Sequence, residues 1–204
     1  MSGQEPPLGG VVLDTRKLLH QLIKERFPGQ TVVTASLMAS SIVVLRMVSE
    51  IDCATQIIFC RRPPFFDEST EYRTRIVELL GLQNVSMNEG HEAQIRPGDN
   101  DHCEYMWIQH RSPGRSFEIL HLNDSLAPYH CWISAVYHDS RPDHVRSLIE
   151  GEGQLTRVNP LIHWTKDDVR EFMTVHNLPY HKMAKKKYRQ SKSKESGFSP
   201  SYHY

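Results

Sequence analysis

The stretch Thr31–Ile51, TVVTASLMASSIVVLRMVSEI, decides the expected fold because it contains two different patterns of apolar residues. Its first residues are β-branched and apolar, which is typical of a buried strand. The segment SSIVVLRMVSEI is typical of a buried helix. A serine-rich turn joins them, with Ser36 at the end of the strand and Ser40 at the start of the helix. A strand that passes through a short polar turn into a helix indicates a β-α-β unit.

The alternation continues on both sides of this stretch. Residues 13–27 predict an amphipathic helix, with Asp14 or Thr15 as its N-cap. Residues 56–60 are short, apolar and β-branched, and they predict a second strand. Residues 67–82 predict a helix that ends at a glycine, Gly81.

The second half of the chain is less regular. After a third strand at 84–87 and a polar loop at 88–102, residues 104–122 predict a helix that Pro113-Gly114 bends or breaks. Residues 129–137 predict a strand, and residues 138–157 a charged loop. A strand-like turn then leads into a helix over 165–178 that Thr165 caps.

This order predicts an α/β fold with a mainly parallel sheet and helices on both faces. Residues 31–36, 56–60 and 131–136 are expected to be neighbouring central strands. The expected organisation is a flexible N-terminus over 1–12, one α/β domain over 13–181 and a basic tail over 182–204.

Composition favours an ordinary globular protein. The formal net charge is zero, so no overall field directs the chain to nucleic acid or to a membrane. The N-terminal residues lack the pattern of a signal peptide, and no run reaches the roughly 18 apolar residues of a membrane span. The four cysteines form no Cys-x-x-Cys pair and predict no disulfide framework, so we expect a cytoplasmic protein without contact to membranes.

Ligands of open parallel sheets bind beyond the carboxyl ends of the strands. Ser36 and Ser40 lie at such an end, where helix N–H groups suit a phosphate or sulfate; the alternative is that these serines only cap the helix. Arg61 follows the second strand, and His138 and Arg141 follow the strand at 131–136; the alternative for all three is a solvated loop.

Twelve histidines raise the question of a metal. His130 and Cys131 are adjacent on an expected strand, where neighbouring side chains point to opposite faces. We therefore expect no metal site.

The segment VNPLIHWTKDDVREFMTVHNLPYH, residues 158–181, resembles the sulfonucleotide reductases, the phosphoadenylyl-sulfate and adenylyl-sulfate reductases of sulfate assimilation. The serine-rich turn and the segment QIIFCRRPPFFDEST, residues 56–70, resemble the same family. The resemblance covers roughly residues 15–181 and the tip of the tail. It implies an adenine-nucleotide α-hydrolase-like fold and a nucleotide bound beyond the strand ends.

The resemblance also implies that the tip of the tail corresponds to a catalytic segment of the family. Members of this family end near a Glu-Cys-Gly-Leu tip, whose thiolate attacks the sulfur of the sulfonucleotide; thioredoxin or glutaredoxin then releases the product. Here the tip reads Glu195-Ser196-Gly197-Phe198, with serine in place of the cysteine. A serine hydroxyl needs a strong base beside it and cannot form the disulfide that releases the product. A partner thioredoxin or glutaredoxin is therefore expected only for an active protein.

Other family positions are altered as well. Met38 replaces the glycine of the nucleotide loop, Arg61 and Pro63 replace residues of an Asp-Thr-Gly turn, and Tyr137-His138 replaces an Arg-Arg pair. The cysteine pairs that hold an iron–sulfur cluster in the adenylyl-sulfate branch are absent from the sequence, so no cluster and no other cofactor is expected.

Three hypotheses follow. The first is a catalytically impaired member of the family that still binds an adenine nucleotide of the phosphoadenosine phosphate type, forms a homo-oligomer or pairs with an active homologue. The second is an active enzyme on a sulfonucleotide or related adenylate that uses another nucleophile. The third is an interaction protein whose basic tail, with its tyrosines, binds nucleic acid or an acidic partner.

Overall fold

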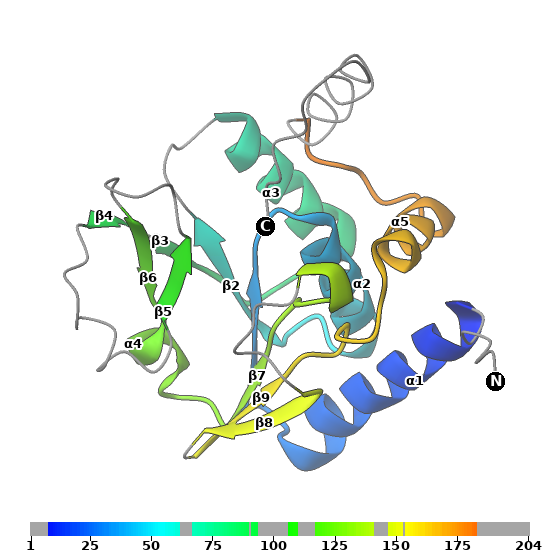
Figure 1. Cartoon of the computed structure of the whole chain (residues 1–204), viewed down its shortest axis with the longest axis horizontal. Helices are drawn as coiled ribbons and strands as arrows, with labels where there is room; N and C mark the ends of the chain where they lie inside the picture. The colour runs from blue at the N-terminus through cyan, green and yellow to red at the C-terminus, as the bar shows by residue number, and fades with distance from the viewer. Residues whose placement is uncertain are drawn as a thin grey trace.

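The structure, a computed structural model, describes residues 8–61, 67–89, 91–93, 106–109, 117–140, 147–152 and 154–182. Helices and strands alternate along most of the chain (Figure 1). In order they are α1 (Leu8–His20), the π-helix η1 (Gln21–Arg26), β1 (Thr31–Ala35), α2 (Ala39–Ile51), β2 (Gln56–Arg61), α3 (Asp67–Leu80), β3 (Val85–Glu89), β4 (His91–Ala93), β5 (Met106–Gln109), β6 (Phe117–His121), α4 (Asn123–Leu126), β7 (Cys131–Ile133), the 3-10 turn η3 (His138–Ser140), β8 (Ile149–Glu152), β9 (Leu155–Val158) and α5 (Lys166–Val175).

A six-stranded sheet forms the centre of the domain, in the order β3-β2-β1-β7-β9-β8. Every neighbouring pair is parallel except β8 and β9. Val33 of β1 lies opposite Ile57 of β2 on one side and opposite Ile133 of β7 on the other. The predicted α/β class is confirmed, and the three strands expected at the centre are neighbours.

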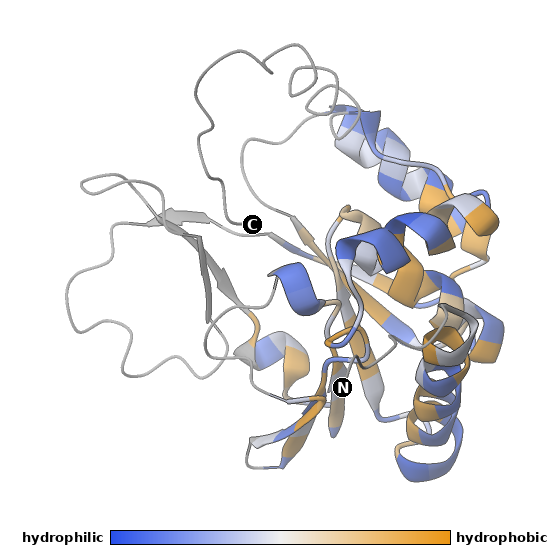
Figure 2. Cartoon of the chain, turned by 45° about the vertical axis from the view of Figure 1, so that its right-hand side comes forward, coloured by the Kyte–Doolittle hydropathy of each residue, from blue (hydrophilic) through white to orange (hydrophobic). Residues whose placement is uncertain are grey.

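Helices cover the two faces of this sheet unequally. Val33, Ile57 and Ile133 face the larger core, which α1, η1, α2, α3 and α5 complete (Figure 1). The alternate residues of the same strands, such as Ile58 and Trp132, face a smaller cluster that includes Leu126 of the short helix α4. The strands between these layers are among the most hydrophobic parts of the chain (Figure 2). Burial on both faces explains why their sequences are continuous apolar runs.

Residues 104–122 do not form the bent helix that the sequence predicted. Their described parts are β5 and β6, which pair antiparallel, and β4 pairs with β6 to complete a separate three-stranded sheet. Pro113-Gly114 falls in the connection between β5 and β6, outside the described residues. A Pro-Gly pair between two short apolar runs suits a turn between paired strands better than a helix.

The charged loop predicted for residues 138–157 is also wrong in part, because β8 and the first residues of β9 lie within it. Glu150 and Arg157 are directly opposite each other across this antiparallel pair. An apolar pattern does not predict these strands, because they contain charged residues. Opposite charges in facing positions nevertheless stabilise such a pair. The loop predicted at 88–102 likewise contains the last residues of β3 and all of β4.

The first helix begins earlier than expected. It starts at Leu8, so neither Asp14 nor Thr15 is its N-cap, and it includes residues 8–12 of the segment predicted to be flexible. Thr15 lies inside the helix and is buried. Its hydroxyl donates to the carbonyl of Pro160 at 3.5 Å and accepts from Trp164 Nε1 at 3.0 Å. This residue therefore joins α1 to a turn almost 150 residues later in the chain.

Thr165 caps α5 as predicted. Its Oγ1 accepts a hydrogen bond from the Asp168 backbone N–H at 3.2 Å, and the Asp168 carboxylate accepts one from the Thr165 N–H at 2.7 Å. This reciprocal pair is a capping box, which satisfies two N–H groups that the helix itself leaves without partners.

Replacing the cap is expected to cost a measurable part of the stability. Thr165→Ala should lower the free energy of unfolding by about 1 kcal/mol, the usual cost of losing an N-cap side chain. Urea unfolding of Thr165→Ala beside Thr174→Ala, an exposed threonine of the same helix, measures it. We expect the control to stay within about 0.5 kcal/mol of the parent. Equal losses in the two variants would contradict the role of the cap.

Candidate functional site

The carboxyl ends of β2, β1, β7 and β9 lie at the same edge of the sheet, because these strands are parallel neighbours. The turn after β1 and the start of α2 therefore lie between the ends of β2 and β7. Ser36, Arg61 and His138 follow or end these strands, so the fold brings their backbones to this edge. The side chain of Arg61 lies outside the described residues, as do Arg141 and Ser196 in full.

The turn after β1 is held by its own serines. The Ser41 hydroxyl accepts from the Ser36 N–H at 3.1 Å and lies 3.0 Å from the Ser36 hydroxyl. The Ser36 hydroxyl in turn accepts from the Met38 N–H at 3.3 Å. Ser40 is buried, and no serine is the N-cap of α2, because that position belongs to Met38. The serines thus fix the shape of the turn rather than cap the helix.

Met38 shows what the missing glycine means for the backbone. Its φ of −82° and ψ of 155° are an extended conformation that any residue adopts. The turn therefore needs no glycine for its shape. Compared with a glycine, Met38 adds a side chain at this turn, and that side chain is 56% exposed. The first hydrogen bond of α2 runs from the Ile42 N–H to the Met38 carbonyl at 3.2 Å. The N–H groups of residues 39–41 precede it and have no acceptor within the helix.

His138 is fixed beside the start of α5. Its backbone N–H donates to the Trp164 carbonyl at 3.0 Å, and its Nδ1 lies 3.2 Å from the Asp139 carboxylate. Asp139 also accepts from the Lys166 N–H at 2.7 Å. The hydrogen bond from His138 and then the one from Lys166 hold the pKa of Asp139 below its ordinary value. The basic residues predicted after β7 are therefore accompanied by an ionised carboxylate, that of Asp139.

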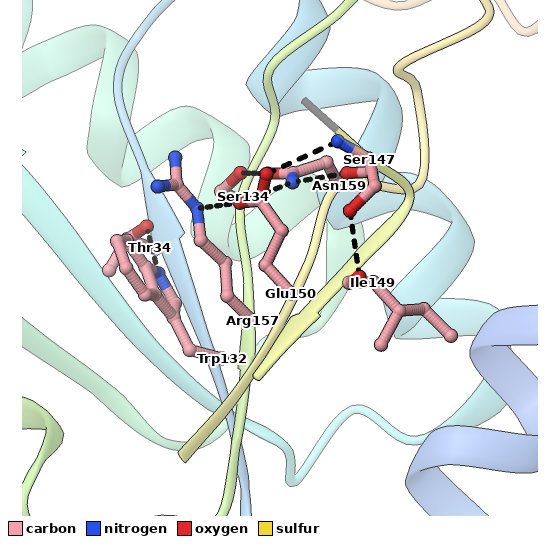
Figure 3. A network of polar contacts seen from close by, with 8 residues as sticks. All are labelled: Thr34, Trp132, Ser134, Ser147, Ile149, Glu150, Arg157 and Asn159. Atoms are coloured by element: carbon pink, nitrogen blue, oxygen red, sulfur yellow. Dashed lines mark hydrogen bonds and ion pairs between the residues drawn. The ribbon is translucent and has the colours of Figure 1, made fainter. Parts of the chain in front are cut away.

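A polar network at the ends of β7 and β9 was not predicted. The buried side chain of Asn159 follows β9 directly and lies between Ser134, which follows β7, and Ser147 (Figure 3). Its Oδ1 accepts from the Ser134 hydroxyl at 2.5 Å, and its Nδ2 donates to the Ser147 carbonyl at 2.9 Å. A polar residue placed directly after a buried apolar strand, as in Val-Asn-Pro, was the available signal.

The same network reaches the face of the sheet away from the four larger helices. The Arg157 guanidinium lies over the Trp132 ring, 4.6 Å from its centre, and its Nε is 3.8 Å from the Glu150 carboxylate (Figure 3). Trp132 Nε1 donates to the Thr34 hydroxyl at 2.8 Å. Both stacked side chains are buried. Their contacts join β1, β7 and β9 on the α4 side of the sheet.

The last described residues pack against α3. The Tyr72 hydroxyl donates to the Pro179 carbonyl at 2.6 Å, and the His181 ring lies edge-on to Tyr72 and 3.2 Å from the Ser69 hydroxyl. Burial lowers the pKa of His181 and favours its neutral ring. Since α3 begins just beyond the end of β2, the described chain ends, at Lys182, near the candidate edge.

The described cysteines do not fit an iron–sulfur cluster. Cys131 is buried in β7, Cys60 lies near the end of β2, and Cys53 follows α2. These are three separate places, since β1 separates β2 from β7. Within the described ranges no three His, Cys, Asp or Glu side chains are grouped so as to hold a metal ion.

Burial raises the pKa of the Cys131 thiol to about 11. At about pH 8 only about one molecule in a thousand then carries the thiolate that reacts with alkylating reagents. We expect iodoacetamide to leave Cys131 unlabelled in the native protein and to label it after unfolding, while the half-buried Cys53 and Cys60 serve as internal controls in the same peptide map. Native labelling of Cys131 at the rate of Cys53 would contradict this expectation.

One groove lies well away from this edge. It has a volume of about 480 Å³ and lies between α1, η1 and the last turn of α2, which is at the amino ends of the strands. Arg16 and Glu50 line it and form an ion pair of 2.8 Å. None of the residues predicted for the candidate site lines this groove.

The sheet order, the crossover helices and the polar turns at one edge define an α/β protein with an adenine-nucleotide α-hydrolase-like fold. Residues 30–190 match the model of the phosphoadenosine phosphosulfate reductase domain. The chain therefore belongs to this family, as the resemblance in its sequence implied.

Relatives and solved structures agree with this assignment. An adenosine 5'-phosphosulfate reductase from Mesorhizobium japonicum is 26% identical over 79% of this chain and 64% of its own length. Adenosine 5'-phosphosulfate reductase 2 from Bacillus subtilis is 28% identical over 83% of this chain and 77% of its own length. The crystal structure of a phosphoadenylyl-sulfate reductase from Candida auris has a TM-score of 0.55 at 12% identity and covers 92% of this chain and 94% of that one, which shows the shared fold. None of the helices in the described ranges has the length and apolar character to cross a membrane.

Proposed function

We propose that this protein is a diverged sulfonucleotide-reductase-family protein that binds an adenine nucleotide beyond the strand ends and has lost the reductive chemistry. The observation that carries the proposal is Ser196, which stands where the family carries its nucleophilic cysteine. Family membership supports the nucleotide, and the replacement of a thiol by an alcohol supports the loss of chemistry.

The turn between β1 and α2 supports the binding of a phosphate group. The N–H groups of residues 39–41 lie at the positive end of a 13-residue helix, where an anion is favoured. The hydrogen bonds among Ser36, Ser41 and Met38 hold the turn in place before a ligand arrives. A phosphate here gains charge-assisted hydrogen bonds, each contributing about 1.5–3 kcal/mol before desolvation.

Under the proposal, basic residues that end or follow the strands set the strength of binding. Arg61 ends β2, and His138 and Arg141 follow β7. Asp139 opposes them, because it lies within 3.2 Å of His138. This carboxylate, together with the Met38 side chain at the turn, supports an affinity in the micromolar range or weaker, about −8 kcal/mol at best.

The tail is long enough to bring Ser196 to this edge. The described chain ends at Lys182, beside α3, and Ser196 follows 14 residues later (196 − 182). Fourteen extended residues reach about 46–50 Å, more than the width of a small domain. Under the proposal the tail places a hydroxyl, rather than a thiol, beside the bound nucleotide.

Titration calorimetry with 3'-phosphoadenosine 5'-phosphate, ATP and AMP tests the binding. We expect micromolar dissociation constants and several-fold weaker binding for Arg61→Ala and His138→Ala. Added salt should weaken binding by screening the cations.

Arg26→Ala is the matched control, because Arg26 is an exposed arginine of η1 at the other end of the domain. It should bind like the parent. If no adenine nucleotide binds, or if Arg61→Ala and His138→Ala both bind like the parent, the edge is no nucleotide site, and an interaction protein with a basic tail becomes the better account.

A second candidate is an active enzyme that uses another nucleophile, and the position of Cys60 favours it. This half-buried thiol is at the penultimate residue of β2, next to Arg61 and at the candidate edge. Its Sγ lies 3.9 Å from the Ile58 carbonyl, a weak contact. Sulfite release that survives Ser196→Ala but not Cys60→Ser would establish this candidate and overturn the first.

A further inference from the structure

The outer edge of β3 is an unusual surface of this domain. β3 is the last strand of the six-stranded sheet, and it pairs with β2 on one side only. In the part of the chain that the structure describes, no strand pairs with its other side. Two apolar side chains of this strand are exposed, Val85 by 36% and Met87 by 37%.

The direction of the backbone groups follows from the parallel ladder. Ile57 of β2 lies opposite Val85, and its N–H donates to the Asn84 carbonyl at 2.8 Å. Successive residues of a strand direct their N–H and C=O groups to opposite sides. Asn84 and Ser86 therefore face β2, while the N–H and C=O groups of Val85 and Met87 point away from the sheet.

Most of this edge lacks the features that protect edge strands from pairing, and Glu89, the last residue of β3, is its one charged residue. The run Gln83-Asn84-Val85-Ser86-Met87-Asn88 contains no charged residue and no proline. The opposite edge of the same sheet is different, because β8 has only four residues and two of them, Glu150 and Glu152, are acidic. The β3 edge is thus uncharged over residues 83–88, whereas β8 carries two acids in four residues.

The sequence of the β3 edge is symmetric in chemical type. Asn84-Val85-Ser86-Met87-Asn88 reads amide, apolar, hydroxyl, apolar, amide from either end. An antiparallel strand of the same sequence, centred on Ser86, places Val85 opposite Met87 and Asn84 opposite Asn88. This register also meets the backbone requirement, because Val85 and Met87 are the residues whose hydrogen-bonding groups point outward.

We propose that β3 is a self-association edge, at which two copies of this chain pair antiparallel about a two-fold axis through Ser86. Each Val85 exchanges two backbone hydrogen bonds with Met87 of the other copy, which gives four bonds in all and joins the two sheets into one. The inference is independent of the nucleotide site, since it rests on the edge strand alone.

The two rows of side chains along β3 suit this pairing. Met87 lies on the α3 side, where Arg73 Nη1 is 2.7 Å from its sulfur. Asn88 lies on the α4 side and donates to the Ser125 hydroxyl at 3.0 Å. The joined strands would thus carry an apolar row beneath the two copies of α3 and an amide-hydroxyl row on the α4 side, and facing side chains of like polarity stabilise paired strands.

Cross-linking tests the register directly. Residues facing each other at a position without backbone bonds have Cα atoms about 4.5 Å apart, which a disulfide spans. We expect Ser86→Cys to form a disulfide-linked dimer under mild oxidation. Asn84→Cys is the matched control, since the two-fold axis separates its copies by four residues along the strand, about 13 Å. The parent, treated alike, measures the contribution of its own cysteines; equal cross-linking of both variants overturns the proposed register.

Disruption of the edge tests the association itself. By analytical ultracentrifugation at roughly 100 μM we expect the parent to be dimeric, and Val85→Lys or Met87→Pro to raise the dissociation constant at least about tenfold. Proline is tolerated at 87 because the N–H lost there points outward, and circular dichroism checks that each variant is folded. Val175→Lys makes the same change at a 70% exposed valine of α5 and should leave the dimer intact. A monomeric parent, or a dimer that both edge variants leave unchanged, overturns the proposal.

Discussion

Purified protein supplied with thioredoxin and phosphoadenylyl sulfate is expected to release no sulfite above the protein-free background. The step needs a nucleophile that is ionised near neutral pH, and a serine hydroxyl is not, unless a base accepts its proton. Of the thiols that the structure describes, Cys131 is buried and its raised pKa leaves almost none of it ionised, and Cys60 would act only under the second candidate. Sulfite is measured directly, with adenylyl sulfate as a second substrate.

Ser196→Cys alone is expected to leave the rate at background, although it restores the thiol. Met38 still places an exposed side chain at the turn after β1, and the sequence resemblance implies that Arg61 replaces an acid of the family. Ser196→Ala is the control for effects of the tail itself. Robust sulfite release by the parent would refute the loss of chemistry, and release by Ser196→Cys alone would show that the pocket still accepts a sulfonucleotide.

The largest loss of stability is expected from Trp164→Ala, which should lower the free energy of unfolding by about 3–5 kcal/mol. Trp164 is fully buried and lies edge-on to Phe172, with ring centres 5.7 Å apart. Its indole N–H donates to Thr15, and its backbone carbonyl accepts from the His138 N–H. The substitution leaves a cavity and removes a hydrogen bond that joins α1 to the segment before α5.

Two further variants separate packing from hydrogen bonding in the same urea unfolding experiment. Thr15→Val keeps the volume but leaves the indole N–H without its partner, which should cost about 1–3 kcal/mol. Val175→Ala, at an exposed position, should change stability by less than about 0.5 kcal/mol. If Trp164→Ala costs no more than Val175→Ala, the turn at residues 160–164 does not anchor the domain.

The parts of the fold that the sequence predicted are those where local pattern and burial agree. Residues 31–51 form β1 and α2 because the strand is apolar on both faces and the helix is buried along its length. α3 ends at Leu80, directly before Gly81, whose φ of +62° is the left-handed conformation that a glycine after a helix predicts. Thr165 is recognisable because a capping box is a local interaction.

The failures occurred where partners lie far away in the sequence. β5 and β6 are too short and too apolar for a local pattern to separate a strand from a helix, and their pairing decides the matter. Thr15 is of a residue type that is common at helix N-caps, but its partners in the structure are Pro160 and Trp164.

The candidate site shows the same division. The positions of Ser36 and His138 at one edge followed from strand order, but the hydrogen bonds of His138 and its neighbour Asp139 to the segment that starts α5 did not. The sequence does not predict the polar network around Asn159, because only the folded structure places this residue between Ser134 and Ser147. The roles of Ser36, Ser40, Arg61, His138, Arg141 and Ser196 stay predictions.

The central place of β1 has a consequence during synthesis on the ribosome. β2 and β3 follow β1 closely, but β7, which covers the other side of β1, begins 100 residues after it (131 − 31). Synthesis of the 42 residues from the end of β3 to the start of β7 (131 − 89) takes about 2–8 s at about 5–20 residues per second, and during this time the half-built sheet has an open central edge. α1 lacks its hydrogen-bond partners for even longer, because Pro160 and Trp164 are synthesised after β7. The nascent chain is therefore most exposed to wrong pairing in this interval, when Val32 and Val33 lie at an edge that the finished protein buries completely.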